Sequence, residues 1–205
     1  MAHPTILQAG SRYSFRSYFE LPYDTDEVLA EFGYRFQRAY LDLPHSQVAM
    51  PQLSGLKQQL EEVIPYVTLS SEAAKREALV APILMRVAIA CQTLLRIEYS
   101  LTVDEYLQGT LDYFMQSEKG LVVVEAKRDD LTRGFTQLGV EMIALAKLNP
   151  ELELIYGAVT IGELWVFGTL NQVKKLILRD IQSFKVPEDV EALTQVLVGI
   201  LQEKL

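Results

Sequence analysis

The sequence contains very little cysteine and histidine. Cys91 is the single cysteine among 205 residues, which excludes an intramolecular disulfide, and its apolar surroundings predict a buried thiol. The two histidines, His3 and His45, lie in N-terminal stretches without a nearby group of Asp or Cys. Histidine-based zinc sites and Ser-His-Asp catalysis are therefore not expected.

Long apolar runs are also missing. The longest hydrophobic stretch, residues 78–95, is interrupted by Pro82, Arg86 and Gln92. No uninterrupted apolar run approaches the roughly 18 residues that are needed to cross a bilayer. The first residues, MAHPTILQAGSR, lack the basic start and apolar segment of a signal peptide. These absences predict a cytoplasmic protein with no membrane partner.

Low-complexity segments are absent, and 49% of the residues are hydrophobic, enough for one substantial core. We expect an N-terminal extension with a connecting helix over residues 1–66 and a main domain over 67–205, together forming one compact unit. The net charge of −8 opposes tight binding to a polyanion. It implies weak, salt-sensitive binding, or a protein partner that delivers the substrate, although a local basic patch can coexist with it.

Acidic and basic side chains interrupt the hydrophobic pattern within residues 106–141. The run Val122 to Val124 predicts a strand buried on both faces, and Glu125 and Lys127 follow at its end. Because side chains alternate along a strand, these two charges share one side. Residues 107–114 predict a second strand, and the polar turn 116–120 folds it back as a hairpin that brings Asp112 alongside Glu125.

This hairpin predicts two carboxylates and an ammonium group at one edge of a sheet. Asp112 and Glu125 offer the oxygen ligands that a hard divalent cation prefers, and Lys127 is left for a water or a phosphate oxygen. Unpaired burial of such charges costs several kcal/mol each. The three groups should therefore be paired, metal-bound or partly hydrated.

Asp112 followed by Glu125-Ala126-Lys127 resembles the motif of the PD-(D/E)XK nuclease superfamily. Residues 109–112, Gly-Thr-Leu-Asp, are similar to the GxxD form found in the branch related to the RecB nuclease domain, and Gln137 falls where that branch has QxxxY. Leu111 replaces the Pro of the name, and Glu141 stands in place of the Tyr. The resemblance covers roughly residues 72–170.

The resemblance implies an α/β restriction-endonuclease-like fold, with an αβββαβ core whose central mixed sheet is flanked by helices. It further implies a nuclease that needs Mg²⁺ or Mn²⁺, acts on nucleic acid, expected to be DNA, and works as a homodimer. Metal ligands would be Asp112, Glu125, Glu77 and the backbone carbonyl of Ala126. Lys127 would orient the attacking water or stabilise the pentacovalent state, and Gln137 would steady the substrate or Lys127. Gln137 and Arg133 would bind the substrate.

Several of these residues also fit a purely structural role. Glu77 also fits an exposed acid favoured by the helix dipole, and Glu98 is expected to face solvent outside the site. Arg133, Gln137 and Glu141, four apart, also fit a solvated charged helix face. For the whole protein, a catalytically silent interaction module and a small-molecule metalloenzyme on another α/β scaffold are the two rivals.

The rest of the chain predicts helices and strands around this centre. An N-terminal β-α-β extension is expected from strands at 11–21 and 34–43, which pair with each other around a short helix ending at Gly33. Its Arg12, Arg16, Arg35 and Arg38, interleaved with tyrosines, fit either nucleic-acid binding or a half-exposed sheet face. Further helices are expected at 53–63, after Ser70 or Ser71, after Asp129 or Asp130 and from Pro187. Strands are expected at 95–102, 152–160 and 164–170, with an edge strand at 173–178; Trp165 and Phe167 should pack in the core.

Overall fold

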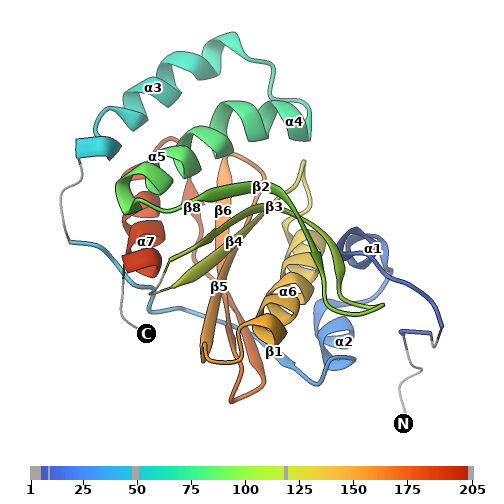
Figure 1. Cartoon of the computed structure of the whole chain (residues 1–205). Helices are drawn as coiled ribbons and strands as arrows, with labels where there is room; N and C mark the ends of the chain where they lie inside the picture. Colours follow the sequence, from blue (N-terminus) through green and yellow to red (C-terminus); the bar gives the residue numbers. More distant parts are fainter. Residues whose placement is uncertain (1–5, 9, 48–50, 118–119, 203–205) are drawn as a thin grey trace.

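A mixed β-sheet carries the fold (Figure 1). The computed structural model describes residues 6–8, 10–47, 51–117 and 120–202, and in this part of the chain the sheet has eight strands in the order β1-β7-β6-β5-β4-β3-β2, with β8 added beside β6. β4 runs parallel to β5, and β1 to β7, whereas the other pairs are antiparallel. The strands are β1 Arg35–Ala39, β2 Leu95–Thr102, β3 Gln108–Gln116, β4 Leu121–Ala126, β5 Leu154–Thr160, β6 Leu164–Asn171, β7 Leu176–Asp180 and β8 Phe184–Lys185.

Helices cover both faces of this sheet (Figure 1). α3, α5 and α7 enclose one hydrophobic cluster, and α1, α2 and α6 enclose the other. In the described residues no helix is both long and apolar enough to traverse a bilayer. The helices are α1 Phe15–Glu20, α2 Thr25–Ala30, α3 Leu56–Val63, α4 Glu72–Lys75, α5 Ala81–Cys91, α6 Leu131–Leu148 and α7 Val190–Gln202, with a π-helical turn Arg76–Val80 and two short 3-10 turns, Pro51–Leu53 and Ile64–Tyr66.

The valine run of β4 shows how the sequence builds two cores. Val122 and Val124 pack into the cluster beneath α5 and α7, whereas Val123 packs into the cluster beneath α6, and all three are fully buried. This confirms the prediction of a strand buried on both faces. Trp165 and Phe167 of β6 are also fully buried, as predicted.

The predicted β3–β4 hairpin is present. Tyr113 pairs with Val124 and Phe114 with Val123, whereas positions 118 and 119 of the expected turn lie outside the described residues. β2 has the predicted bounds, and α6 begins after Asp130, whose side chain accepts hydrogen bonds from the Thr132 and Arg133 N–H groups. The chain is thus an α/β protein with a helix-flanked mixed sheet, as expected.

The N-terminal β-α-β extension was wrong in its first strand and in the pairing of its second, whereas the second strand itself is present as β1. Within residues 11–21 the chain forms the helix α1, Phe15–Glu20, because Phe15 and Tyr18, three apart, bury one helical face against α6 and β3. β1 pairs in parallel with β7, with Arg35 opposite Leu176, and not with residues 11–21. The residues of this stretch fit both the two-residue period of a strand and the longer period of a helix. Burial of Phe15 and Tyr18 in the folded protein selects the helix. Through β1, the N-terminal part shares the sheet of the main domain.

Candidate active site

A cavity of about 660 Å³ lies at the carboxyl end of β4, between α1 and the α4 region. Lys127 follows β4 directly, and its N–H donates to the carbonyl of Thr160 at the end of the parallel strand β5 (2.7 Å). This bond holds the residue after β4 at the sheet edge. The cavity is lined by Ser14, Arg16, Phe19, Glu72, Arg76, Glu98, Gly109, Thr110, Asp112, Glu125, Lys127, Arg128, Asp129 and Gln137.

The hairpin brings the two predicted carboxylates into this cavity. Asp112 Oδ2 accepts a hydrogen bond from the Ala126 N–H (2.9 Å), so the Asp112 side chain crosses to the strand that carries Glu125. The N–H and C=O of one strand residue face the same neighbour, so the main chain of Ala126 is directed toward Asp112. Burial raises the pKa of Asp112, against the lowering by Arg76 and by the Ala126 hydrogen bond.

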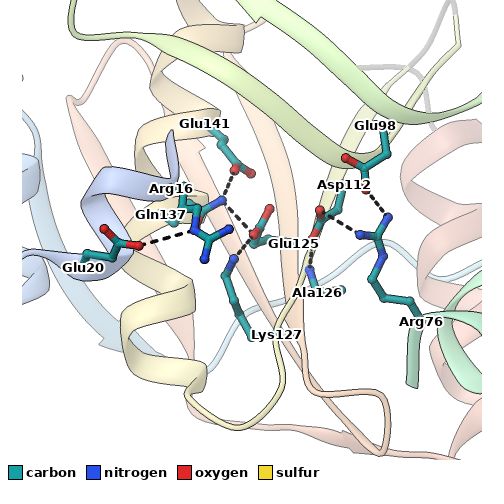
Figure 2. A network of polar contacts seen from close by, with 10 residues as sticks. All are labelled: Arg16, Glu20, Arg76, Glu98, Asp112, Glu125, Ala126, Lys127, Gln137 and Glu141. Atoms are coloured by element: carbon teal, nitrogen blue, oxygen red, sulfur yellow. Dashed lines mark hydrogen bonds and ion pairs between the residues drawn. The ribbon is translucent and has the colours of Figure 1, made fainter. Parts of the chain in front are cut away.

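Glu125 and Lys127 form a close ion pair inside the cavity (Figure 2). Their side chains are 1% and 12% exposed, so little water screens the pair. Burial lowers the pKa of Lys127, but the Glu125 carboxylate outweighs this effect and the net pKa is raised. The Lys127 Nζ also lies 5.0 Å from the centre of the Phe19 ring, a cation–π contact from α1. Lys127 is therefore held as an ammonium group.

Gln137 links Glu125 to a second buried acid, Glu141. Its Nε2 donates to Glu125 Oε1 (2.7 Å) and to Glu141 Oε1 (2.9 Å), as Figure 2 shows. The remaining oxygens of all three side chains, Glu125 Oε2, Gln137 Oε1 and Glu141 Oε2, are buried without a hydrogen-bond partner. The alternative of a solvated face is wrong for Gln137 and Glu141, which are 3% and 0% exposed.

Two carboxylates so close cannot both ionise easily. Burial, followed by the charges of Glu141 and Asp112, raises the pKa of Glu125 well above its usual value. Burial raises the pKa of Glu141 to about 8, against the lowering by the Gln137 hydrogen bond. Lys127 acts in the opposite direction and favours the charged form of Glu125.

Arg76 and Glu98 were not assigned to the site from the sequence, yet both line the cavity. Arg76 bridges two acids: Nη2 lies 2.6 Å from Glu98 Oε1, and Nη1 lies 3.4 Å from Asp112 Oδ1 (Figure 2). The pairs Ile97–Tyr113 and Tyr99–Leu111 place Glu98 opposite Asp112. Glu98 faces solvent as expected, with its side chain 56% exposed, but it also lines the cavity, because this register turns it toward Asp112.

Two predicted residues are not brought into the cavity. Glu77 is exposed in the π-helical turn and does not line the cavity, where its neighbour Arg76 stands instead. Arg133 is also exposed and lies 3.7 Å from Asp130 across one helical turn. The metal role of Glu77 and the substrate role of Arg133 remain predictions. Both placements agree with the alternatives, an exposed acid near a helix start for Glu77 and a solvated helix face for Arg133.

Comparisons with known proteins give no relative of high similarity. No protein-family model and no curated protein matches the chain. A solved structure described as "cryoEM structure DrdV-DNA complex" has 14% sequence identity and a TM-score of 0.46. The match covers 77% of this chain, which spans 14% of the length of that one. At this similarity the likeness carries no argument about fold or function.

The donors in the cavity fit a hard cation with few protein ligands. Asp112 and Glu125 offer carboxylate oxygens, and Glu125 Oε2 has no hydrogen-bond partner despite its burial. In the described residues, no group of three or more His, Cys, Asp or Glu side chains is arranged to hold a metal ion. Mg²⁺ commonly binds through one or two carboxylates, with water and substrate phosphates as its other ligands. The site therefore fits Mg²⁺ or Mn²⁺ better than a metal that needs a complete protein cage.

Gly109 of β3 lies where α1 packs closely against β3, beside the cavity. Its φ is +143°, and a Cβ added there would lie 3.0 Å from the Phe15 main-chain N and 3.0 Å from its ring. We expect Gly109→Ala to lower the free energy of unfolding by about 2 to 4 kcal/mol, from backbone strain and overpacking. Gly33→Ala is the control, since Gly33 has φ +78° but open space around it. Urea unfolding of both variants measures the difference, and equal losses would contradict the close approach of α1.

Proposed function

We propose that this protein is a metal-dependent nuclease of restriction-endonuclease-like fold that hydrolyses phosphodiester bonds in nucleic acid, with DNA as the expected substrate. One observation carries the proposal: Asp112, Glu125, Lys127 and Gln137, from β3, β4, the end of β4 and α6, meet in one cavity. The order of α5, β2, β3, β4, α6 and β5 supports the αβββαβ core that the motif resemblance implies.

Asp112, Glu125 and the Ala126 carbonyl would hold a Mg²⁺ or Mn²⁺ ion. Such an ion, when bound, lowers the pKa of a coordinated water and stabilises negative charge on phosphate oxygens. The Ala126 N–H fixes Asp112, and Gln137 fixes Glu125 by its 2.7 Å hydrogen bond, so the two carboxylates are oriented by main chain and amide groups. Contacts within the protein therefore orient both carboxylates before a substrate binds.

The remaining side chains would act on water and phosphate. Lys127 can donate a hydrogen bond to the attacking water or to a phosphate oxygen, where negative charge grows in the transition state. Arg76 contacts Asp112 on the side away from Lys127. Its guanidinium group can exchange the ion pair with Glu98, whose side chain is 56% exposed, for an ion pair with a phosphate oxygen. The water oxygen bonds to phosphorus and gives up a proton to solvent, the ester P–O bond breaks, and the leaving oxygen takes a proton from solvent.

A catalytically silent module remains the second candidate function, because both carboxylates expected to bind the metal already have a cationic neighbour. Arg76 lies against Asp112 and Lys127 against Glu125, so these two charges have partners within the protein. The net charge of −8 also disfavours a general affinity for nucleic acid. Metal binding separates the two functions, since only the nuclease requires it.

Calorimetric titration with Mn²⁺ tests the proposal without a choice of substrate. We expect saturable binding to the native protein, and an affinity at least tenfold lower in a variant carrying both Asp112→Ala and Glu125→Ala, because both carboxylate ligands are lost. The control variant carries Asp104→Ala and Glu163→Ala. These acids also form lysine ion pairs, with Lys147 and Lys75, but lie outside the cavity.

Circular dichroism establishes that all variants are folded before the titrations are compared. Binding that survives in the first variant would place the metal elsewhere. If the native protein binds no Mn²⁺ even with an oligonucleotide present, the silent module is the better description.

A further inference from the structure

Helix α1 is a fixed wall of the cavity. Phe15 and Tyr18 are buried at 0% and 1% exposure, and the Tyr18 hydroxyl donates to the Tyr106 carbonyl (2.6 Å). Gly109 accepts the close approach of Phe15, and Ser14 bridges to Gln108 at the start of β3. In Figure 1, α1 lies beside α6, against the half of the sheet that holds β3. These contacts leave α1 little freedom to move away from the site.

The reactive groups lie below the surface that α1 helps to form. The side chains of Glu125, Lys127 and Asp112 are 1%, 12% and 14% exposed. A phosphate must therefore enter the 660 Å³ cavity to reach them. In B-DNA each phosphate is part of a stiff double helix with a persistence length of about 50 nm, so one phosphate cannot enter the cavity without the rest of the duplex meeting its rim. One flexible strand can lower a single phosphate into a cavity of this size.

The α1 wall also offers the groups that bind a single strand. Phe19 is partly exposed in the cavity, and its ring is next to Lys127, which would face the phosphate. Arg16, one helical turn before Phe19, also lines the cavity; its side chain is 83% exposed and close only to Glu20. An aromatic face beside cationic groups is the combination on which proteins stack bases while neutralising the backbone.

We infer that the substrate of this site is a single nucleic-acid strand, threaded between α1 and the α4 region, with a base stacked on Phe19 and the adjacent phosphate beside Lys127. The inference rests on the proposed nuclease function and adds the strandedness of the substrate. Phe19 is a substrate-binding residue in this arrangement, and Arg16 guides the strand into the cavity. The overall negative charge suits such a local site, which engages only a few phosphates.

Binding and cleavage of matched oligonucleotides test the inference. Fluorescence anisotropy with a labelled 12-nucleotide DNA strand, and with the same strand in a duplex, is measured in Ca²⁺ with the DNA checked for integrity on a gel. We expect at least tenfold tighter binding of the single strand. Phe19→Leu keeps an apolar side chain but removes the ring, and should weaken single-strand binding by roughly five- to a hundredfold.

Tyr40→Leu is the matched control for the loss of an aromatic side chain. Tyr40 is 73% exposed and follows β1, four strands from β4, which is roughly 19 Å at normal strand spacing. Its binding should equal that of the native protein. An equally tight or tighter duplex complex, no binding of either DNA, or no effect of Phe19→Leu would overturn the inference.

Cleavage in Mn²⁺ separates this inference from the proposed function. Single-strand binding that depends on Phe19, without any cleavage, would reject the nuclease but keep the strand-binding site. Cleavage of the duplex faster than the single strand would keep the nuclease and reject the single-strand inference.

Discussion

Lys127→Ala is expected to reduce nucleic-acid cleavage at least about a hundredfold while the protein stays folded. The Lys127 ammonium is the cation of the cavity that pairs directly with Glu125, and it would donate to the attacking water or to the phosphate. Removal of one group that stabilises growing charge or moves a proton in the transition state typically costs a factor of 10² to 10⁴. Single-turnover cleavage in Mn²⁺ measures the loss at the chemical step.

The fold should survive because Glu125 has another way to lose its charge. Without Lys127, the Glu125 carboxylate would be buried next to Glu141 with no cation in contact with it, which is costly for an ionised group. The pKa of Glu125 is already raised by burial, so the acid takes up a proton in the variant and the cost becomes that of a neutral group. Thermal unfolding of the variant checks this point.

Lys75→Ala is the matched control for this experiment. The Lys75 side chain is as little exposed as that of Lys127, at 12%, and its Nζ lies 3.1 Å from Glu163, but it does not line the cavity. It should lose stability comparably and keep cleavage. Full activity in Lys127→Ala, or an equal loss in both variants, would remove Lys127 from the mechanism.

The centre of the site was predictable because it depends on a local hairpin. One strand run, one turn and the two-residue period place Asp112, Glu125 and Lys127 together without knowledge of the remaining fold. Gln137 was found only through the resemblance to a motif. Its periodicity alone equally fits a solvated helix face, since nothing in α6 indicates that the cavity wall would bury it.

The residues that were missed or misplaced come from elements whose placement is not local. Phe19 was missed, and Arg16 was expected on a strand; both reach the cavity because residues 15–20 form a helix, and in this stretch the two- and three-residue periods give conflicting predictions. Arg76 enters through a π-helical turn, a change of phase that a regular helical pattern does not predict. Glu98 could have been found from the hairpin register, which sets it opposite Asp112.

Glu141→Gln is expected to reduce the pH dependence of stability between pH 5 and pH 9. Glu141 is fully buried, and burial raises its pKa from 4.5 to about 8. The variant keeps the size of the side chain and an oxygen that can accept from Gln137 Nε2, the hydrogen bond that measures 2.9 Å in the native protein. It differs from the native protein mainly in that it can no longer ionise.

The sign of this pH dependence follows because the folded protein binds the Glu141 proton more tightly than the unfolded chain does. The folded protein keeps the Glu141 proton up to about pH 8, whereas the unfolded chain releases it near pH 4.5. The stability due to the neutral acid is therefore fully present below pH 4.5 and is lost as the pH rises through 8. At about 1.4 kcal/mol per pKa unit, the native free energy of unfolding should fall by roughly 3 to 5 kcal/mol over this window.

Urea unfolding at several pH values, with EDTA present to exclude metal ions, measures this loss. Glu141→Gln should be the more stable protein at pH 9 and nearly equal to the native protein at pH 5. Glu62→Gln makes the same chemical change on an exposed residue of α3 and should follow the native curve. An unchanged slope in Glu141→Gln would mean that Glu125 holds the proton, and the Lys127 ion pair would then need a different description from the one given by the structure.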